Sequence, residues 1–267
     1  MGLAALLVIQ YYYYYATTTK SSSSSGECVV SLGAYKGHQY TTKETLGRKC
    51  LVESKWMRIQ QHKVMLAGQS TPIVDWLWID YHDRINVLVE APPSSNKGKE
   101  KERQFYVFQQ SKYALEDKSS LAIIGGIIEP GERPERAAFR EVEEEMQLSC
   151  TELQFLGRFR TDVNRGMGWV NSYLAAHCTP TTTTMSSNKK TEGNQVVGTA
   201  DVERQDLKTM SLTELREAAR EGAFVEVQWS NTVALALLYP ELASSIGGIL
   251  SIIVSSYAYQ VDYTYGR

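Results

Sequence analysis

The pattern of apolar and polar positions predicts strands in the first half of the chain. Between Cys50 and Asp83, KCLVESKWMRIQQHKVML alternates imperfectly, and TPIVDWLWIDY is rich in β-branched and aromatic residues after a turn. The two stretches together predict an antiparallel hairpin or small sheet. RINVLVEA follows as an apolar strand, and FYVFQQSKY is the next strand after an exposed, charged loop.

Helical patterns enter in the second half of the chain. A helix is predicted within residues 130–147, followed by the strands LQFLGRFRTD and WVNSYLAAHC around the loop VNRGMG. Ser211 with Glu214 three residues later is a capping-box signature for another helix, and SNTVALALLYPEL predicts a last helix that ends before Pro240. Strands therefore surround a few helices, which indicates a mixed α+β fold with a sheet packed by helices.

The chain is expected to comprise four parts, and low-complexity stretches mark its two tails and an insertion. The N-terminal homopolymers of Tyr, Thr and Ser indicate either a disordered tail or a cleaved targeting segment, and an uncharged C-terminal stretch favours a packed tail over membrane contact, because Ser, Gly and Gln dilute it. We expect a cytoplasmic protein, with organellar targeting by the N-terminal segment left open. The expected parts are a tail at 1–27, a small β-sheet region at 28–82, a main domain at 83–241 with a disordered insertion at 179–200, and a tail at 242–267.

Composition narrows the possible partners. The chain has 267 residues, of which 43% are hydrophobic, so it can bury a substantial core. Its net charge of −2 excludes an obvious polyanion partner, and we expect no nucleic acid. The cysteines lie far apart without a CxxC motif, a pattern that we interpret as free thiols in a reducing compartment. They are Cys28, Cys50, Cys150 and Cys178.

The segment GGIIEPGERPERAAFREVEEEMQL, from Gly125 to Leu148, concentrates acid in a way that indicates a cation site. On a helix, Glu141, Glu144 and Glu145 share one face, where like charges repel one another. A divalent cation would neutralise them, and hard oxygen ligands suit Mg²⁺ or Mn²⁺. The glycine pair at the end of the preceding apolar strand would allow close backbone approach.

The same segment resembles the Nudix box. Five residues separate Gly126 from Glu132, and seven separate Glu132 from Arg140, where the acidic run begins. The resemblance implies the Nudix fold, a mixed β-sheet sandwiched by helices, here with a small N-terminal antiparallel sheet. One position departs from the family, which has glycine where Gln147 stands. Glycine would permit a left-handed turn at the helix end, a conformation that Gln adopts less readily.

Roles for individual residues follow from this resemblance. Nudix enzymes hydrolyse a nucleoside diphosphate linked to another moiety, with Mg²⁺ bound by acidic side chains of the box. The implied metal ligands are Glu141 and Glu145, then Glu144 and the carbonyl of Gly125. Arg140 and Glu132 would orient these carboxylates. The general base would come from the loop TADVERQD, with Glu203 as the candidate and Asp201 in reserve.

Softer similarities over residues 49–241 favour the ADP-ribose or ADP-sugar pyrophosphatase branch, with its dimer-forming N-terminal sheet. FQQSKY stands where that branch has an Arg-Gln-Tyr-Arg-like strand, although both arginines are missing. Trp76 and Trp78 could stack an adenine, but their alternating strand positions favour core or dimer interface. Arg165 is either a phosphate clamp or an exposed loop arginine.

The expected activity is Mg²⁺-dependent hydrolysis of a nucleoside diphosphate sugar to AMP and a sugar phosphate by a homodimer. A Nudix hydrolase of another substrate, such as a dinucleoside polyphosphate or coenzyme A, is the first alternative. A non-catalytic nucleotide-sensing module is the second.

Overall fold

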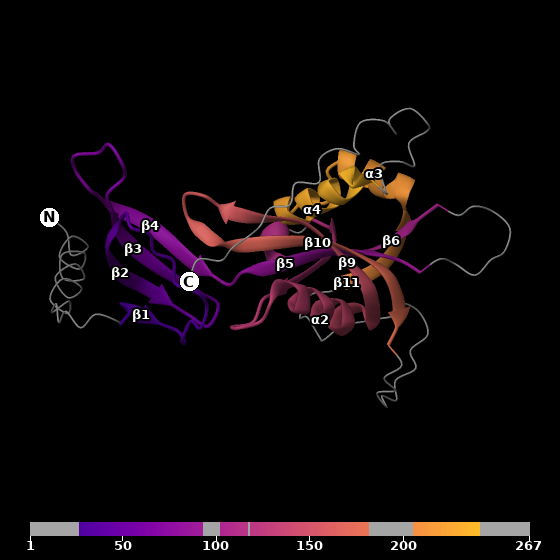
Figure 1. Cartoon of the computed structure of the whole chain (residues 1–267), viewed down its shortest axis with the longest axis horizontal. Coiled ribbons are helices and arrows are strands. Elements are labelled where there is room, and N and C mark those ends of the chain that lie inside the picture. The colour runs from indigo at the N-terminus through magenta and orange to yellow at the C-terminus, as the bar shows by residue number, and fades with distance from the viewer. Residues whose placement is uncertain (1–26, 93–101, 117, 182–204, 241–267) are drawn as a thin grey trace, which may run out of the picture. The chain divides into compact units, whose positions relative to one another are not determined.

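The computed structural model of the chain describes residues 27–92, 102–116, 118–181 and 205–240 (Figure 1). Both tails, nearly all of the predicted insertion and the candidate bases Asp201 and Glu203 lie outside these ranges. Within the described ranges, no helix is both long and apolar enough to span a membrane.

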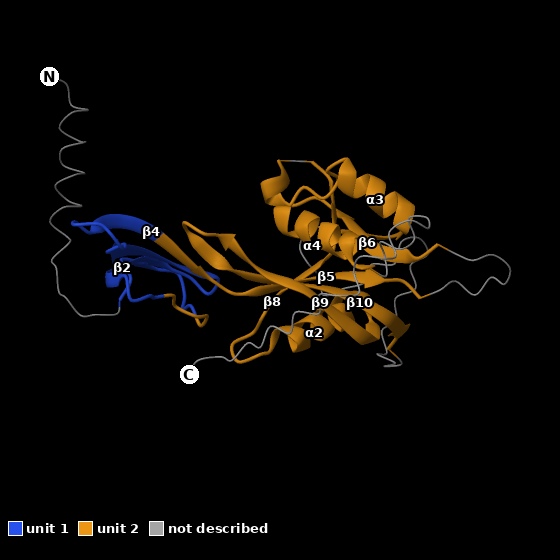
Figure 2. Ribbon diagram, turned by 45° about the horizontal axis from the view of Figure 1, so that its top comes forward, with its two compact units in different colours: residues 1–35, 41–77 blue, residues 36–40, 78–267 orange. Residues whose placement is uncertain are grey.

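The chain folds into two compact units (Figure 2). The first unit comprises residues 1–35 and 41–77, and the second comprises residues 36–40 and 78–267. In the first unit, β2 and β3 form an antiparallel hairpin that lies largely within the first of the two predicted stretches, and β1 pairs with β2 in parallel. The strands of this region are β1 (Val30–Ser31), β2 (Thr45–Glu53), β3 (Met57–Val64) and β4 (Ile73–Tyr81), the last of which continues into the second unit.

The sheet of the second unit is built around β5 (Arg84–Glu90). Its side chains Ile85, Val87, Leu88 and Val89 are all 0% exposed, as expected for a central strand covered on both faces. β5 runs parallel to β10 and antiparallel to β6 and β8. The other strands are β6 (Gln104–Gln110), β7 (Ser120–Ala122), β8 (Ile124–Ile127), β9 (Leu148–Asp162), β10 (Gly166–Pro180) and β11 (Gln205–Ser211), with a short 3₁₀ helix η1 (Tyr113–Leu115) after β6.

Helices cover both faces of this sheet (Figure 1). α2 (Pro134–Met146) lies on one face and buries Ala137, Ala138, Val142 and Met146, while α3 (Leu212–Arg220) and α4 (Val227–Leu238) lie on the other. The predicted capping box of α3 is confirmed, since the Glu214 amide donates to Ser211 Oγ at 3.2 Å and the Ser211 amide to Glu214 Oε2 at 2.7 Å. The predicted α+β sheet sandwiched by helices is therefore confirmed.

Three local expectations are corrected. β11 was not predicted, because its sequence QDLKTMS lacks a clear alternation. The strand before α2 does not stop at the glycine pair, since Gly125 and Gly126 both pair with β5 inside β8. β10 extends to Pro180, two residues into the range expected to be a disordered insertion.

The expectation of free thiols is wrong for the four cysteines. Cys28 is bonded to Cys50, and Cys150 to Cys178. The partners are 22 and 28 residues apart, so no short motif reveals them in the sequence. Folding brings them together, because Cys150 and Cys178 are directly opposed in the antiparallel register of β9 and β10.

Candidate active site

Gly126 allows the acidic helix to approach the sheet. α2 packs against β5, β8 and β9, and Glu141 extends from it toward β8. A Cβ atom at position 126 would lie 2.1 Å from the Cδ atom of Glu141, a distance that real side chains do not tolerate. The absence of a side chain at Gly126 therefore creates the space that the Glu141 carboxylate occupies.

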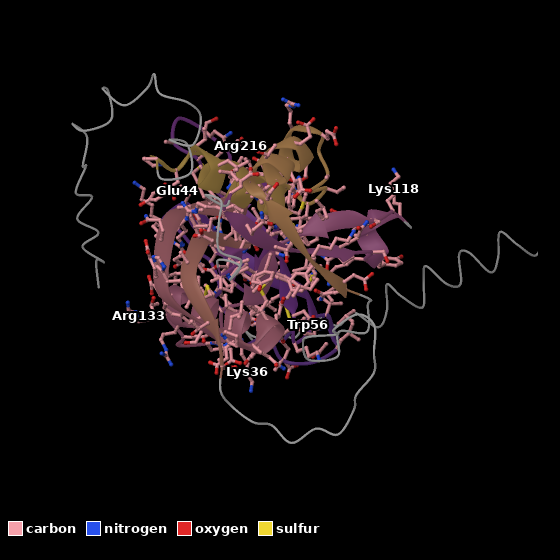
Figure 3. The ribbon with its side chains drawn as sticks, turned by 90° about the vertical axis from the view of Figure 1, so that its right-hand side faces the viewer. Lys36, Glu44, Trp56, Lys118, Arg133 and Arg216 are labelled. Atoms are coloured by element: carbon pink, nitrogen blue, oxygen red, sulfur yellow. A yellow bond between two sulfur atoms is a disulfide. The ribbon has the colours of Figure 1, made fainter. Side chains whose placement is uncertain are left out.

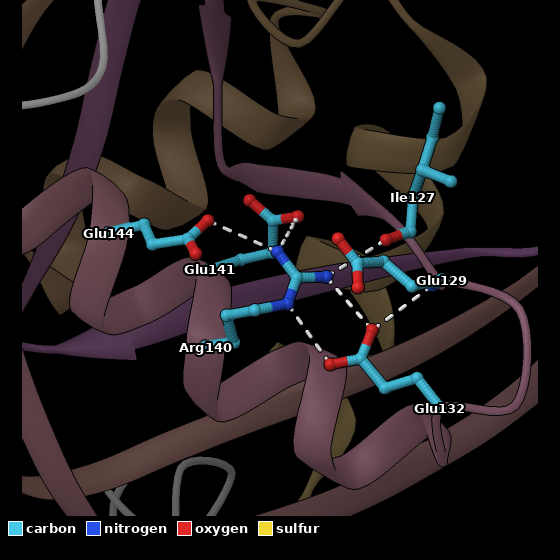
Figure 4. A network of polar contacts seen from close by, with 6 residues as sticks. All are labelled: Ile127, Glu129, Glu132, Arg140, Glu141 and Glu144. Atoms are coloured by element: carbon cyan, nitrogen blue, oxygen red, sulfur yellow. Dashed lines mark hydrogen bonds and ion pairs between the residues drawn. The ribbon is translucent and has the colours of Figure 1, made fainter.

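Arg140 is the centre of a polar network between α2 and the preceding loop (Figure 4). Its Nε and Nη2 atoms donate to the two oxygens of Glu132 at 3.0 and 2.9 Å. This bidentate ion pair fixes the relative orientation of the guanidinium and the carboxylate. Nη1 donates to Glu141 at 2.7 Å and to Glu144 at 3.1 Å, and Nη2 also reaches the carbonyl of Ile127 at 3.0 Å. The role expected for Arg140 and Glu132, orientation of the acidic side chains, agrees with these contacts.

Arg140, inside α2, is far less exposed than Arg133, which precedes the helix at its N-cap position. The side chain of Arg133 is 79% exposed and extends outward (Figure 3), whereas that of Arg140 is 26% exposed. The hydrogen bond to Glu132 raises the pKa of the Arg140 guanidinium, and this effect, together with that of Glu141, outweighs burial, which lowers it. Arg140 therefore stays charged and keeps the network intact.

The pKa values of Glu132 and Glu141 shift in opposite directions. The hydrogen bond from Arg140 lowers the pKa of Glu132, which stabilises its ionised form. Burial raises the pKa of Glu141, and the nearby Glu144 and Glu132 add to this effect, although Arg140 opposes it. The Glu141 carboxylate is thus only partly compensated, and a cation beside it would be bound favourably.

The donor set fits a hard divalent cation. Glu141, Glu144, Glu145 and the backbone carbonyl of Gly125 offer only oxygen atoms, the ligands that Mg²⁺ and Mn²⁺ prefer. In the part of the chain that is described, no three acidic, His or Cys side chains converge as a ready-made metal site. Glu141 and Glu144 both turn to Arg140 instead.

A cavity of about 380 Å³ lies beside this network. Its wall includes Gly125, Gly126 and Glu145 from the acidic segment, so two of the expected metal ligands meet at one cavity, and Glu141 packs against Gly126. Among the polar residues of the same wall that the sequence-based prediction missed are Arg84, Asn86 and Glu226. A signal was present, because Arg84 and Asn86 interrupt the apolar run RINVLVE at alternate positions and must share one face of the strand.

Glu226 occupies the N-cap position of α4, yet its side chain forms no capping hydrogen bond. It lies near Arg84 instead, with 3.9 Å between Glu226 Oε1 and Arg84 Nη1. Burial raises the pKa of Glu226, and the positive charges of Arg84 and Lys112 oppose this only partly. The Glu226 side chain therefore lines the cavity beside Arg84 and does not cap the helix.

Two of the predicted substrate-binding residues, Trp78 and Arg165, are not part of this cavity's wall. Trp78 is 6% exposed, donates its indole N–H to Asp80 at 3.0 Å and stacks on Tyr40 with 4.5 Å between ring centroids. This burial favours the core interpretation. Trp76 is half-buried on the part of β4 that belongs to the first unit. Arg165 is exposed in the β9–β10 turn, where Nη1 donates to the neighbouring carbonyl of Asn164 at 3.4 Å.

Comparisons with known proteins agree with the box and the fold. The family model for the Nudix domain matches residues 96–229, just over half of the chain. Among solved structures, one described as "Crystal structure of ADP compounds hydrolase" is 15% identical with a TM-score of 0.55, and the match covers 78% of this chain and 97% of that one. No curated protein matches. The chain, with its acidic helix, glycine pair and helix-covered sheet, belongs to the Nudix hydrolase family.

Proposed function

We propose that this protein hydrolyses the pyrophosphate bond of a nucleoside diphosphate sugar, ADP-ribose or an ADP-sugar, to AMP and a sugar phosphate. The observation that carries the proposal is the carboxylate network around Arg140, joined through Gly126 to a cavity that also contains Gly125 and Glu145. The fold likeness to an ADP compounds hydrolase supports the choice of substrate class.

The chain's own residues would hold and orient a metal ion. Glu141, Glu144, Glu145 and the Gly125 carbonyl would bind Mg²⁺, or Mn²⁺ in its place. When bound, the ion would neutralise pyrophosphate oxygens and lower the pKa of a water molecule. Arg140 would keep the Glu141 carboxylate in place while Glu144 exchanges its contact with Arg140 for the ion.

The proton of the attacking water needs an acceptor. We keep Glu203 as the candidate base, with Asp201 in reserve, although both lie outside the described residues. Arg165 and Trp76 remain candidates for substrate contacts, from an exposed turn and a half-buried strand position respectively. Trp78 is a weaker candidate, since its indole N–H already donates to Asp80.

We also propose that the protein is a homodimer that uses the first unit. Apolar side chains of this unit are exposed, with Leu46 at 54% on β2, Val74 at 56% on β4 and Trp56 at 49% between β2 and β3, and a partner subunit would cover such apolar surface. Sedimentation should show a dimer for the full chain. Deletion of residues 1–27 should not alter it, whereas deletion through Asp80 should abolish both dimerisation and ADP-ribose hydrolysis.

A substrate panel tests the activity. ADP-ribose, ADP-glucose, diadenosine polyphosphates and coenzyme A are incubated with Mg²⁺ or Mn²⁺, and the products are resolved by chromatography. We expect AMP and a sugar phosphate from the ADP-sugars. Preference for diadenosine polyphosphates or coenzyme A would keep the reaction and overturn the substrate, and nucleotide binding without turnover would favour a sensing module.

A further inference from the structure

Two hydrogen-bond donors on β5 are buried and lack an acceptor. Within the described part of the chain, neither Arg84 Nε nor Asn86 Nδ2 has a hydrogen-bond partner, and Asn86 is 3% exposed. A buried donor without an acceptor costs about 1–3 kcal/mol, so such groups are rare unless a ligand or function requires them. Both side chains line the cavity next to the acidic helix.

The position of these donors places them beside the expected metal ligands. Asn86 is the register partner of Gly125 across β5 and β8, and Arg84 is the partner of Ile127. The Asn86 Oδ1 atom lies 3.2 Å from the point where a Cβ on Gly125 would be. A ligand group in contact with the Gly125 backbone would therefore also be within reach of Asn86.

Arg84 is held ready for a ligand. Its guanidinium lies over the ring of Tyr81, 5.3 Å from the centroid, a contact that holds the side chain without using its N–H donors. Glu226 Oε1 lies 3.9 Å from Arg84 Nη1, which is an ion-pair distance and too long for a hydrogen bond. Lys112 adds a second positive charge to the same wall.

A bound anion would provide acceptors for the unpartnered donors and a negative charge opposite Arg84 and Lys112. The unpartnered groups are donors only, and a planar guanidinium beside an amide N–H matches the oxygens of a phosphoryl group. We propose that Arg84 and Asn86 form a phosphoryl subsite, which binds non-bridging oxygens of the substrate's pyrophosphate independently of the metal ion. This inference rests on the proposed function for the identity of the phosphoryl group, and it deepens that function by naming the residues that recognise it.

Binding of ADP in EDTA tests the subsite apart from catalysis. Calorimetry should show that the wild-type protein binds ADP without metal, and that Arg84→Gln weakens binding about tenfold, the worth of one charge-assisted contact. Arg84→Lys keeps the charge without the planar fork and should fall between the two. Asn86→Asp keeps the shape but puts a negative charge at the subsite, and should weaken binding at least as much as Arg84→Gln.

Two further variants separate local electrostatics from general damage. Glu226→Gln removes a negative charge near Arg84 and should tighten ADP binding about twofold to fivefold, a gain that misfolding would not produce. Arg103→Gln is the matched control, because Arg103 is paired with Glu90 at a different cavity, and its ADP affinity should stay within twofold of wild type. Thermal unfolding of each variant verifies the fold.

The outcomes distinguish the subsite from the activity. If the protein binds ADP in EDTA with the expected variant effects but cleaves nothing in the substrate panel, the subsite stands and the proposed function fails. If ADP-ribose is cleaved but Arg84→Gln and Asn86→Asp leave both ADP affinity and KM unchanged, the subsite is refuted. Absence of wild-type binding at millimolar ADP in EDTA would also overturn it.

Discussion

Two cavities of the second unit contain arginine side chains whose surroundings differ: one cavity has buried donors without an acceptor among the residues that the structure describes, and in the other the arginine packs against aromatic rings. In the cavity beside the acidic helix, Arg84 Nε and Asn86 Nδ2 have no partner within the described residues. In a second cavity of about 340 Å³, Arg160 is enclosed by the rings of Tyr40, Trp78 and Trp169 at 5.0, 5.2 and 4.6 Å.

Asp80 completes the aromatic cavity. Its buried carboxylate accepts hydrogen bonds from the Tyr40 backbone at 2.9 Å and from the Trp78 indole at 3.0 Å. The polar groups of this cluster therefore stabilise one another, and its arginine and tryptophans build structure. The sequence kept Trp78 as a candidate for base stacking while favouring a core or interface position, whereas the unpartnered donors point to Arg84 and Asn86 as the ligand-binding groups.

The largest effect is expected at the carboxylates. Glu145→Gln and Glu141→Gln remove metal-binding charge with little change of shape, and kcat should fall by several orders of magnitude. Because burial raises the pKa of Glu141, its ionised form destabilises the metal-free protein at neutral pH, so Glu141→Gln should leave the free energy of unfolding unchanged or raised. Near-wild-type turnover in either variant at saturating Mg²⁺ would refute the assignment.

Gly126→Ala tests whether the space beside Glu141 matters. The new methyl group would displace the Glu141 carboxylate, since its Cβ would lie 2.1 Å from Cδ. We expect kcat to fall about 100-fold, because small misplacements of catalytic groups have effects of this size. Gly47→Ala is the control, since Gly47 does not have a left-handed backbone and its Cβ position meets only the Cβ atom of Lys63, at 4.0 Å. Equal activity of the two variants would contradict a positional role for Gly126.

Asp80→Ala should produce the reverse pattern, with loss of stability and retention of activity. The part-buried Tyr40 amide and the buried Trp78 indole N–H would lose their acceptor, which should lower the free energy of unfolding by about 2–4 kcal/mol. At a temperature where the variant is folded, kcat should remain within a few-fold of wild type. A loss of kcat comparable to that of Gly126→Ala, measured on folded protein, would make the aromatic cavity part of the active site.

The pH dependence of activity should report on Glu141. Its carboxylate must be ionised to bind a cation, and its raised pKa means that protonation begins at a higher pH than for an ordinary glutamate. Accordingly, kcat/KM should decline on the acid side from above the usual glutamate range. Because metal and proton compete, higher Mg²⁺ should move this decline to lower pH. A profile that is insensitive to Mg²⁺ concentration would assign the acid limb to another group.

The sequence predicted best where one segment contained the whole signal. α2 spans Pro134–Met146 inside the predicted range of 130–147, because a proline start, an apolar stripe and an acidic face coincide there. Arg84, Asn86 and Glu226 come from β5 and the start of α4, and only the fold brings them to Gly125. The disulfides were missed for the same reason, since strand register and not spacing pairs Cys150 with Cys178.

The smallest effect is expected at Gln147, where the family has glycine. Gln147 adopts the left-handed conformation, with φ 54° and ψ 39°, and its amide donates to the Glu143 carbonyl at 2.9 Å. Glycine would keep these backbone contacts and relieve a strain of about 1–2 kcal/mol, partly offset by its greater freedom in the unfolded chain. We expect Gln147→Gly to raise the free energy of unfolding by about 0.5–1 kcal/mol in denaturant titrations, with kcat within twofold of wild type. Glu143→Gly, four residues earlier on the exposed side of the same helix, should instead lower it by about 1 kcal/mol. If glycine at position 147 lowers both stability and activity, the Gln side chain itself supports the helix end, and its departure from the family is an adaptation and not a handicap.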